Sequence, residues 1–156
     1  MGIGYDAHRF AAGRRLVLAG VEIEHPRGLA GHSDADVVAH AVIDAVLGAA
    51  GLDDIGALFP DTEPGYADAD SLELLRQVVA RVGAAGWRVG NVDVVVVCEE
   101  PRLAAYRAAM KAGLAAALGT SPEAVGVKAT TTEGMGFEGR REGVAATAVC
   151  LLDQTD

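Results

Sequence analysis

Three of the four histidines, His8, His32 and His40, lie close in sequence to acidic residues. Asp6-Ala7-His8 falls at the end of a predicted strand, where residues two apart share a face and lie roughly 6.5 Å apart. His40 falls in a predicted helix, with Asp36 and Asp44 four residues away on either side, and these acids could orient its ring. Two imidazoles and one carboxylate form a ligand set for zinc that leaves a fourth position for water or substrate. The spacing alone also fits an ordinary solvated polar face, so the metal site is a hypothesis at this point.

Three further stretches have compositions that suit a polar ligand. Residues 52–62 mix acids, Gly and Pro in a loop that could hold ligand hydroxyl groups, although an Asx-rich turn has the same composition. Residues 128–133 end a predicted strand with three threonines and a glutamate, which suits phosphate and a hard cation, or simply a β-prone run. Residues 99–103 lead into a predicted helix, whose free amides favour an acceptor-rich ligand, or only mark helix initiation.

The elements that must position these residues can be predicted from hydrophobic spacing. Strands are predicted over 2–8 and 15–23, with Gly13 in the turn between them. Ser33 and Asp36 have the spacing of a capping box, so a helix is predicted to begin there and to end between 48 and 51. A loop follows over 52–69.

The second half of the chain contains two more predicted helices and three strands. A helix is predicted from Ser71 to about residue 84, and another from Pro101 to about residue 118. The valine-rich strand 92–97 is predicted to be buried on both faces. Strands 125–131 and 144–152 are separated by residues 134–139, which are too rich in glycine for regular structure.

This order predicts an α/β (α+β) fold, with a mixed sheet of four to five strands and helices on one face. At 156 residues, of which 51% are hydrophobic, the chain is expected to form a single domain over 1–156. Apolar surface left over on a core of this size favours a homo-oligomer.

The formal net charge of −9 argues against a nucleic acid or an anionic membrane surface as a partner. No apolar run approaches the ~20 residues that span a bilayer, so a cytoplasmic location is expected. Cys98 and Cys150 lie in apolar, strand-like runs, and we expect no structural disulfide.

Taken together, five motifs resemble those of the 2-C-methyl-D-erythritol 2,4-cyclodiphosphate synthase family, in the same order and over nearly the whole chain. They are residues 4–10, residues 31–37 with His40, residues 54–56 with 59–62, residues 128–133 and residues 136–140. The resemblance implies a homotrimer of α/β subunits with active sites between neighbouring chains. It also implies a lyase of the non-mevalonate isoprenoid pathway, which cyclises 4-diphosphocytidyl-2-C-methyl-D-erythritol 2-phosphate and releases CMP.

The resemblance also implies roles for individual residues. Asp6, His8 and His40 would hold zinc or another divalent transition metal, and Glu133 would hold Mg²⁺ or Mn²⁺ on the substrate diphosphate. His32 and Thr131 would stabilise the transition state.

Further residues would contact the substrate, among them the metal ligands Asp6, His8 and Glu133. The methylerythritol phosphate would be surrounded by His32, Ser33, Asp54, Ile55, Gly56, Phe59, Pro60, Asp61, Thr62 and Glu63. The cytidine and its phosphates would be received by Cys98, Glu99, Glu100, Pro101, Arg102, Leu103, Ala104, Thr130, Thr131 and Thr132. Phe137 and Arg140 complete the set.

The chain departs from the family pattern at a few positions. Arg102 stands where the family more often has lysine, and the two are not equivalent donors to phosphate. Arg141 replaces a usual glycine, and the acidic pair Glu99 and Glu100 is unusual beside a nucleotide.

Two other classes of protein are compatible with the residues alone. A mononuclear iron oxygenase also uses two histidines and one carboxylate, but usually on an all-β barrel. A noncatalytic oligomeric binding protein needs only the apolar surplus and the nucleotide-like loop.

Overall fold

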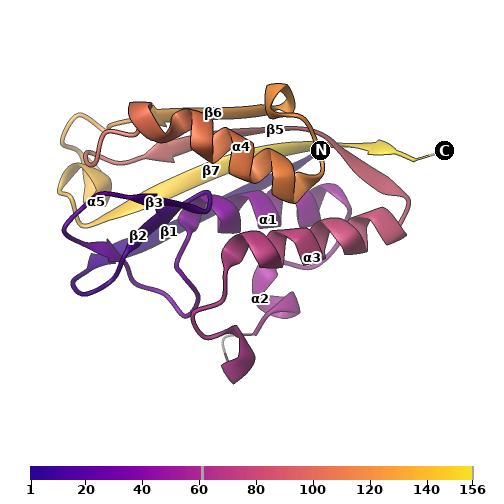
Figure 1. Cartoon of the computed structure of the whole chain (residues 1–156), viewed down its shortest axis with the longest axis horizontal. Coiled ribbons are helices and arrows are strands. Elements are labelled where there is room, and N and C mark those ends of the chain that lie inside the picture. The colour runs from indigo at the N-terminus through magenta and orange to yellow at the C-terminus, as the bar shows by residue number, and fades with distance from the viewer. Residues whose placement is uncertain (61, 156) are drawn as a thin grey trace.

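The computed structural model describes residues 1–60 and 62–155, in which four strands precede the first helix (Figure 1). The elements are, in order, β1 (Gly2–Ala11), β2 (Leu16–Leu18), β3 (Val21–Ile23), β4 (Gly28–Leu29), α1 (Val37–Ala49), α2 (Ile55–Leu58), η1 (Pro64–Tyr66), α3 (Ser71–Ala84), β5 (Trp87–Val97), η2 (Ala104–Tyr106), α4 (Arg107–Leu118), η3 (Pro122–Ala124), β6 (Val125–Thr130), α5 (Gly136–Gly139) and β7 (Gly143–Gln154).

Within the described residues, five strands form one mixed sheet in the order β4-β1-β7-β5-β6. β5 and β6 run parallel, whereas the other neighbours in the sheet are antiparallel. β2 and β3 pair separately as a hairpin. The three long helices, α1, α3 and α4, pack on one face of the sheet (Figure 1). The predicted mixed sheet with helices on one face is therefore confirmed.

α1 lies directly on β1 because a glycine of the strand leaves room for the helix backbone. A Cβ atom at Gly4 would lie only 2.0 Å from the carbonyl oxygen of Ala41. No side chain fits at that distance, so the backbones of strand and helix touch. This close approach brings His40, in the first turn of α1, beside the Asp6 and His8 side chains of β1.

The two faces of the sheet differ in burial. On the helical face Val92, Val94 and Val96 of β5 are fully buried. Val95 and Val97, on the other face, are only half-buried, so within one chain this strand is not buried on both faces as predicted. The face without helices leaves large apolar side chains exposed, namely Ile3, Tyr5, Val149 and Leu151.

The segment 15–23, predicted as one strand, is instead the β2–β3 hairpin, which turns at Ala19 and Gly20. Both turn residues have positive φ angles, 53° and 73°. Their amides donate to the carboxylate of Asp36, at 2.8 and 2.6 Å. The turn depends on a residue sixteen positions away, so the apolar run that contains it reads as continuous strand.

α1 is capped by Asp36, whose side chain accepts from the Ala39 amide at 3.0 Å. Ser33 lies three residues before this cap, so the predicted capping box is wrong. The end of the helix at Ala49 lies within the predicted range.

α3 is confirmed over the predicted residues, Ser71–Ala84, and the strands near the C-terminus are confirmed with boundaries shifted by one or two residues. The helix predicted from Pro101 instead begins at Arg107. Leu103 is buried and anchors the preceding loop to the core, so the chain enters the helix only after the turn of η2.

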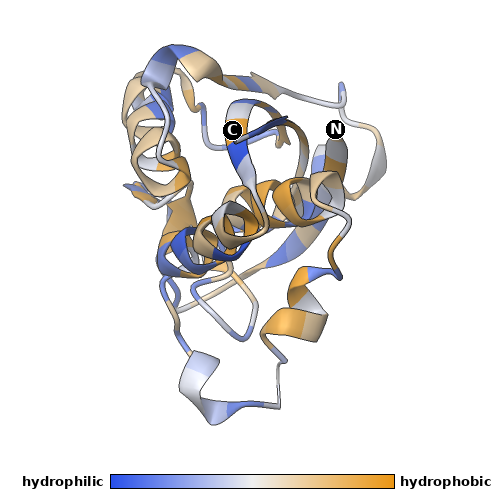
Figure 2. Ribbon diagram, turned by 90° about the vertical axis from the view of Figure 1, so that its right-hand side faces the viewer, coloured by the Kyte–Doolittle hydropathy of each residue, from blue (hydrophilic) through white to orange (hydrophobic). Residues whose placement is uncertain are grey.

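The two loops that were predicted to lack regular structure each contain short helical turns. α2 and η1 lie within the predicted loop 52–69, and α5 lies within 134–139. Figures 1 and 2 show the segment with α2 and η1 projecting from the layered body, with α2 hydrophobic and the following turn hydrophilic. None of the helices in the described ranges has the length and apolar character that a bilayer span requires.

Candidate metal centre and substrate pocket

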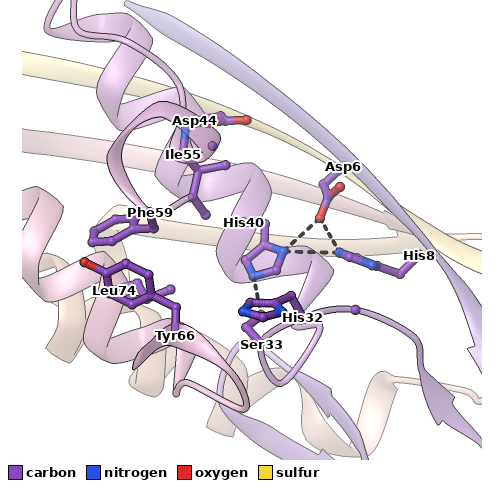
Figure 3. Close-up of a pocket in the computed structure, with 12 residues that line it drawn as sticks. Asp6, His8, His32, Ser33, His40, Asp44, Ile55, Phe59, Tyr66 and Leu74 are labelled. Carbon is purple, nitrogen blue, oxygen red and sulfur yellow. Dashed lines mark hydrogen bonds and ion pairs between the residues drawn. The ribbon is translucent and has the colours of Figure 1, made fainter. Parts of the chain in front are cut away.

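Asp6, His8 and His40 converge where β1 passes under the start of α1 (Figure 3). Asp6 and His8 lie two residues apart on β1, so both side chains project toward the helix. The Asp6 Oδ2 atom lies 2.8 Å from His8 Nε2 and 3.0 Å from His40 Nδ1. The two ring nitrogens are 3.2 Å apart. The structure thus brings together the three residues that the sequence predicts as metal ligands.

These three atoms form a triangle that suits a tetrahedral cation. Around an ion with ligand distances of about 2.0–2.1 Å, neighbouring ligand atoms of a tetrahedron lie roughly 3.3 Å apart. The observed edges of 2.8, 3.0 and 3.2 Å are slightly shorter. Three protein ligands leave one position of such a tetrahedron for another molecule, so the donor set fits a divalent transition metal.

The second nitrogen of each imidazole is held by a hydrogen bond outside the triangle. His8 Nδ1 donates to the carbonyl oxygen of Ala30 at 2.7 Å, so Nε2 is the nitrogen that faces Asp6 and that a metal ion would bind in place of a proton. His40 Nε2 lies 3.1 Å from Ser33 Oγ and 2.9 Å from Ser71 Oγ. Both rings therefore present one nitrogen to the centre and anchor the other.

The prediction that Asp36 or Asp44 orients His40 is wrong. Asp36 is committed to the helix cap and the hairpin turn, and Asp44 accepts from the Ile55 amide at 2.9 Å. The ring is instead contacted by Ser33 and Ser71. Ser71 was not predicted as a site residue, because its place at the start of α3 gives no sign of a partner 31 residues away.

Contacts within the triangle shift the pKa values of Asp6 and His8. Burial alone would raise the pKa of Asp6, but hydrogen bonds and charge from His40 and His8 outweigh it and lower that pKa far below the usual value. Burial alone would lower the pKa of His8, and the Asp6 carboxylate reverses this and raises it. Asp6 is therefore ionised at neutral pH. A metal ion that binds His8 Nε2 must displace a proton from that atom.

A hollow beside the triangle, which we call the metal pocket, is lined by Asp6, His8 and His40 and by several residues that the sequence predicts for substrate binding. These are His32, Ser33, Ile55, Gly56 and Phe59. The lining also includes four residues that were not predicted, Gly31, Asp44, Tyr66 and Leu74. Figure 3 shows Ile55, Phe59 and Tyr66 across the pocket from His8.

The remaining residues of the predicted methylerythritol set lie around this pocket rather than in its lining. Asp54 caps α2 by accepting from the Ala57 amide at 3.0 Å. The Glu63 carbonyl oxygen lies 3.5 Å from His32 Nε2. Pro60 and Thr62 belong to the same loop, and Asp61 lies outside the described residues.

A second hollow, which we call the Cys98 hollow, gathers most of the residues predicted for the cytidine and its phosphates. These are Cys98, Glu99, Pro101, Arg102, Leu103, Ala104, Thr130 and Thr131, joined by Ala129 and Arg107, which were not predicted. None of these residues lines the metal pocket.

The two hollows lie at the same end of the sheet but over different strands. Ala7, Ala145, Val97 and Thr130 are in register across β1, β7, β5 and β6. Three strand spacings of about 4.8 Å therefore separate the ends of β1 and β6, or roughly 14 Å. Among the described residues of one chain, the two predicted halves of the substrate site therefore line two separate hollows.

The two acidic residues at the Cys98 hollow, Glu99 and Glu100, interact with other residues of the chain. Glu99 Oε1 accepts from the Thr132 amide at 3.0 Å and so holds the threonine loop against the end of β5. The Glu100 carboxylate lies 3.6 Å from His25 Nε2 and 3.8 Å from Arg141 Nε. The positive charge of Arg141, which departs from the family pattern, thus offsets the negative charge of the unusual Glu100.

Three other predicted residues lie apart from both hollows. Glu133 is exposed in the turn after β6, with a positive φ of 55°. Phe137 lines another hollow with His8 and Phe10, and His8 also lines the metal pocket. Arg140 is exposed and pairs with Glu142 at 2.8 Å. Their roles in substrate or metal binding stay predictions.

Comparison with known proteins identifies relatives along nearly the whole chain. Residues 1–153 match the YgbB family. The Bifunctional enzyme IspD/IspF of Anaeromyxobacter dehalogenans is 60% identical over 97% of this chain, which spans 39% of that relative. The 2-C-methyl-D-erythritol 2,4-cyclodiphosphate synthase of Moorella thermoacetica is 57% identical, over 97% of this chain and 93% of the relative.

A solved structure of a 2C-methyl-D-erythritol-2,4-cyclodiphosphate synthase in its CDP-bound form superimposes with a TM-score of 0.89 and 38% identity. That match covers 97% of this chain and 99% of the other. Sequence, fold and the converging ligand triad agree, and the chain belongs to the YgbB family, the family of the 2-C-methyl-D-erythritol 2,4-cyclodiphosphate synthases.

Proposed function

We propose that this chain converts 4-diphosphocytidyl-2-C-methyl-D-erythritol 2-phosphate to 2-C-methyl-D-erythritol 2,4-cyclodiphosphate and releases CMP. The observation that carries the proposal is the Asp6, His8 and His40 triangle at the wall of the metal pocket. Family membership and the CDP named for a related structure support the substrate class.

In this reaction an oxygen of the 2-phosphate attacks the β-phosphorus of the cytidine diphosphate. The new P–O bond closes the ring, the bond from the β-phosphorus to the bridging oxygen breaks, and CMP leaves with that electron pair. Both reacting groups are anions, and the chain itself carries a formal net charge of −9. Local positive charge is therefore required to bring them together.

A zinc ion held by Asp6, His8 and His40, and a magnesium or manganese ion held by Glu133, would neutralise and polarise the phosphates when bound. His32, on the wall of the metal pocket, and Thr131, in the Cys98 hollow, would donate hydrogen bonds to the oxygens of the five-coordinate phosphorus. The chain needs no nucleophilic side chain, because positioning and charge stabilisation accelerate phosphoryl transfer.

We assign different parts of the substrate to the two hollows, following the residue roles that the resemblance implies. The metal pocket, with the Ile55, Gly56 and Phe59 wall, would take the methylerythritol phosphate, and the Cys98 hollow would take the cytidine. Because the two hollows share no lining residue and the ends of β1 and β6 lie roughly 14 Å apart, a substrate that occupies both favours a site built from two copies. This supports the homotrimer with active sites between subunits that the resemblance implies.

The exposed apolar face of the sheet supplies a surface for such an assembly. Ile3 and Tyr5 on β1 and Leu151 on β7 are 70%, 59% and 47% exposed. Burial of these side chains between copies would remove apolar area from water. A cytoplasmic location and the absence of nucleic acid and membrane partners remain predictions.

The test is to incubate the purified chain with the diphosphocytidyl substrate and Mg²⁺, and to measure CMP by chromatography and the cyclodiphosphate by ³¹P NMR. We expect both products in equal amounts, and zinc in the purified protein by elemental analysis. Cytidine nucleotide binding without CMP release would instead indicate a binding protein. Stoichiometric iron without CMP release would favour the oxygenase alternative.

A further inference from the structure

The outer nitrogen of His40 is connected to a carboxylate through a buried hydroxyl. His40 Nε2 lies 2.9 Å from the Oγ atom of Ser71, a residue with 0% exposure at the first position of α3. The same hydroxyl bonds to Asp34 Oδ1, and Asp34 Oδ2 accepts from the Ser71 amide at 3.0 Å. Asp34 Oδ1 also accepts from the Asp36 amide at 3.1 Å, so backbone bonds fix the carboxylate on both sides.

The direction of these hydrogen bonds determines which nitrogen of His40 carries the proton. An ionised carboxylate only accepts, so the single hydroxyl proton of Ser71 is donated to Asp34. Toward His40 the Ser71 oxygen can then only accept, so this contact, which at 2.9 Å is shorter than the 3.1 Å to Ser33 Oγ, requires a proton on Nε2. When a metal ion replaces the proton between Nδ1 and Asp6, which lie 3.0 Å apart, the Nδ1 lone pair is then the one available to the metal.

We propose that Asp34 and Ser71 are positioning residues, which hold the His40 ring in the tautomer and orientation that metal binding requires. The proposal rests on the metal site of the proposed function. Ligating histidines in metalloproteins usually donate their other N–H to an acceptor, and loss of that partner weakens metal affinity. Here the acceptor is a hydroxyl polarised by a carboxylate.

The same residues connect the metal ligand to the wall of the metal pocket. The Asp34 amide donates to the Ala69 carbonyl at 3.1 Å, and the Asp68 amide donates to the His32 carbonyl at 2.9 Å. The loop before α3, which carries the pocket residue Tyr66, is therefore joined to the loop before α1. His40 is thus held by the junction of these two loops.

The test is the zinc affinity of Ser71→Ala against wild type, measured by competition with a chromophoric chelator. We expect the dissociation constant to rise about tenfold to a hundredfold. The visible absorption of the Co²⁺-substituted protein should change as well, because it reports ligand orientation. Ser121→Ala makes the same chemical change at the exposed start of η3, and should leave both readouts at wild-type values.

Ser71→Thr keeps the hydroxyl and should retain most of the zinc affinity. Wild-type affinity and an unchanged Co²⁺ spectrum in Ser71→Ala would overturn the positioning role, even if the wild-type enzyme releases CMP. A wild-type chain that binds zinc but releases no CMP would instead contradict only the proposed reaction.

A third measurement needs no variant and covers the case in which the substituted proteins do not fold. In zinc-loaded wild-type protein, the His40 Nε2 proton should appear in ¹H–¹⁵N spectra and exchange slowly with water. Exchange as fast as that of an exposed imidazole would show that the buried hydroxyl does not hold it.

Discussion

The Asp36 carboxylate accepts a hydrogen bond from the Gly20 amide at 2.6 Å and thereby ties the β2–β3 turn to the first turn of α1. Replacing Asp36 by Ala should destabilise the chain by about 3 kcal/mol, because it removes a helix cap and leaves buried amides unpaired. Denaturant unfolding followed by circular dichroism measures this loss. Asp70→Ala removes a single, exposed cap from α3 and should cost only about 1 kcal/mol. Equal losses in the two variants would contradict the special role of Asp36.

His40→Ala should abolish stoichiometric zinc and CMP release while the protein stays folded, because the ring is one of three convergent ligands. Elemental analysis measures the loss of zinc, and the circular dichroism spectrum shows whether the protein stays folded. His32→Ala is the matched comparison, since His32 lines the metal pocket without being one of the three ligands. It should keep zinc and lose turnover. Full zinc occupancy in His40→Ala would remove that residue from the ligand set.

Glu133→Gln should raise the Mg²⁺ concentration needed for half-maximal CMP release by about tenfold or more, since a charged ligand is replaced by a neutral one. Zinc content should not change. A magnesium titration of turnover measures the effect, with Glu123→Gln, exposed in η3, as the control. An unaltered magnesium dependence would place the second cation elsewhere.

The two cysteines should react slowly with thiol reagents in the native protein. Burial raises the pKa of Cys98 to about 11, assisted by the Glu99 charge, and burial raises that of Cys150 to about 11 as well. At pH 8 only about one thiol in a thousand is then ionised, and the thiolate is the reactive form. Reaction with an aromatic disulfide should accelerate about tenfold per pH unit up to pH 10, and both thiols should react rapidly after denaturation. Native rates at pH 8 that match free cysteine would refute this.

The long helices and the valine strand could be predicted from the sequence because their apolar spacing is local and regular. Ser71–Ala84 matches its prediction residue for residue, and the end of α1 falls in the expected glycine-bounded range. The D-x-H pair on β1 could likewise be placed on one face from strand periodicity.

The errors arise where distant residues determine local structure. The turn at Ala19 and Gly20 exists because Asp36 accepts its amides, and nothing in the run from Leu16 to Ile23 signals that partner. Ser33 and Asp36 both fit the pattern of a helix start, and only tertiary contacts show that Asp36 takes the cap and Ser33 turns to His40. Ser71 was missed for the same reason.

The separation of the metal pocket from the Cys98 hollow has a consequence for mixed assemblies. If each site combines the metal pocket of one copy with the Cys98 hollow of its neighbour, two inactive variants can rescue each other. Refolding His40→Ala together with Thr131→Ala in equal amounts would leave about a quarter of the sites with both halves intact. Complementation of this kind is impossible if every chain carries out the cyclisation alone.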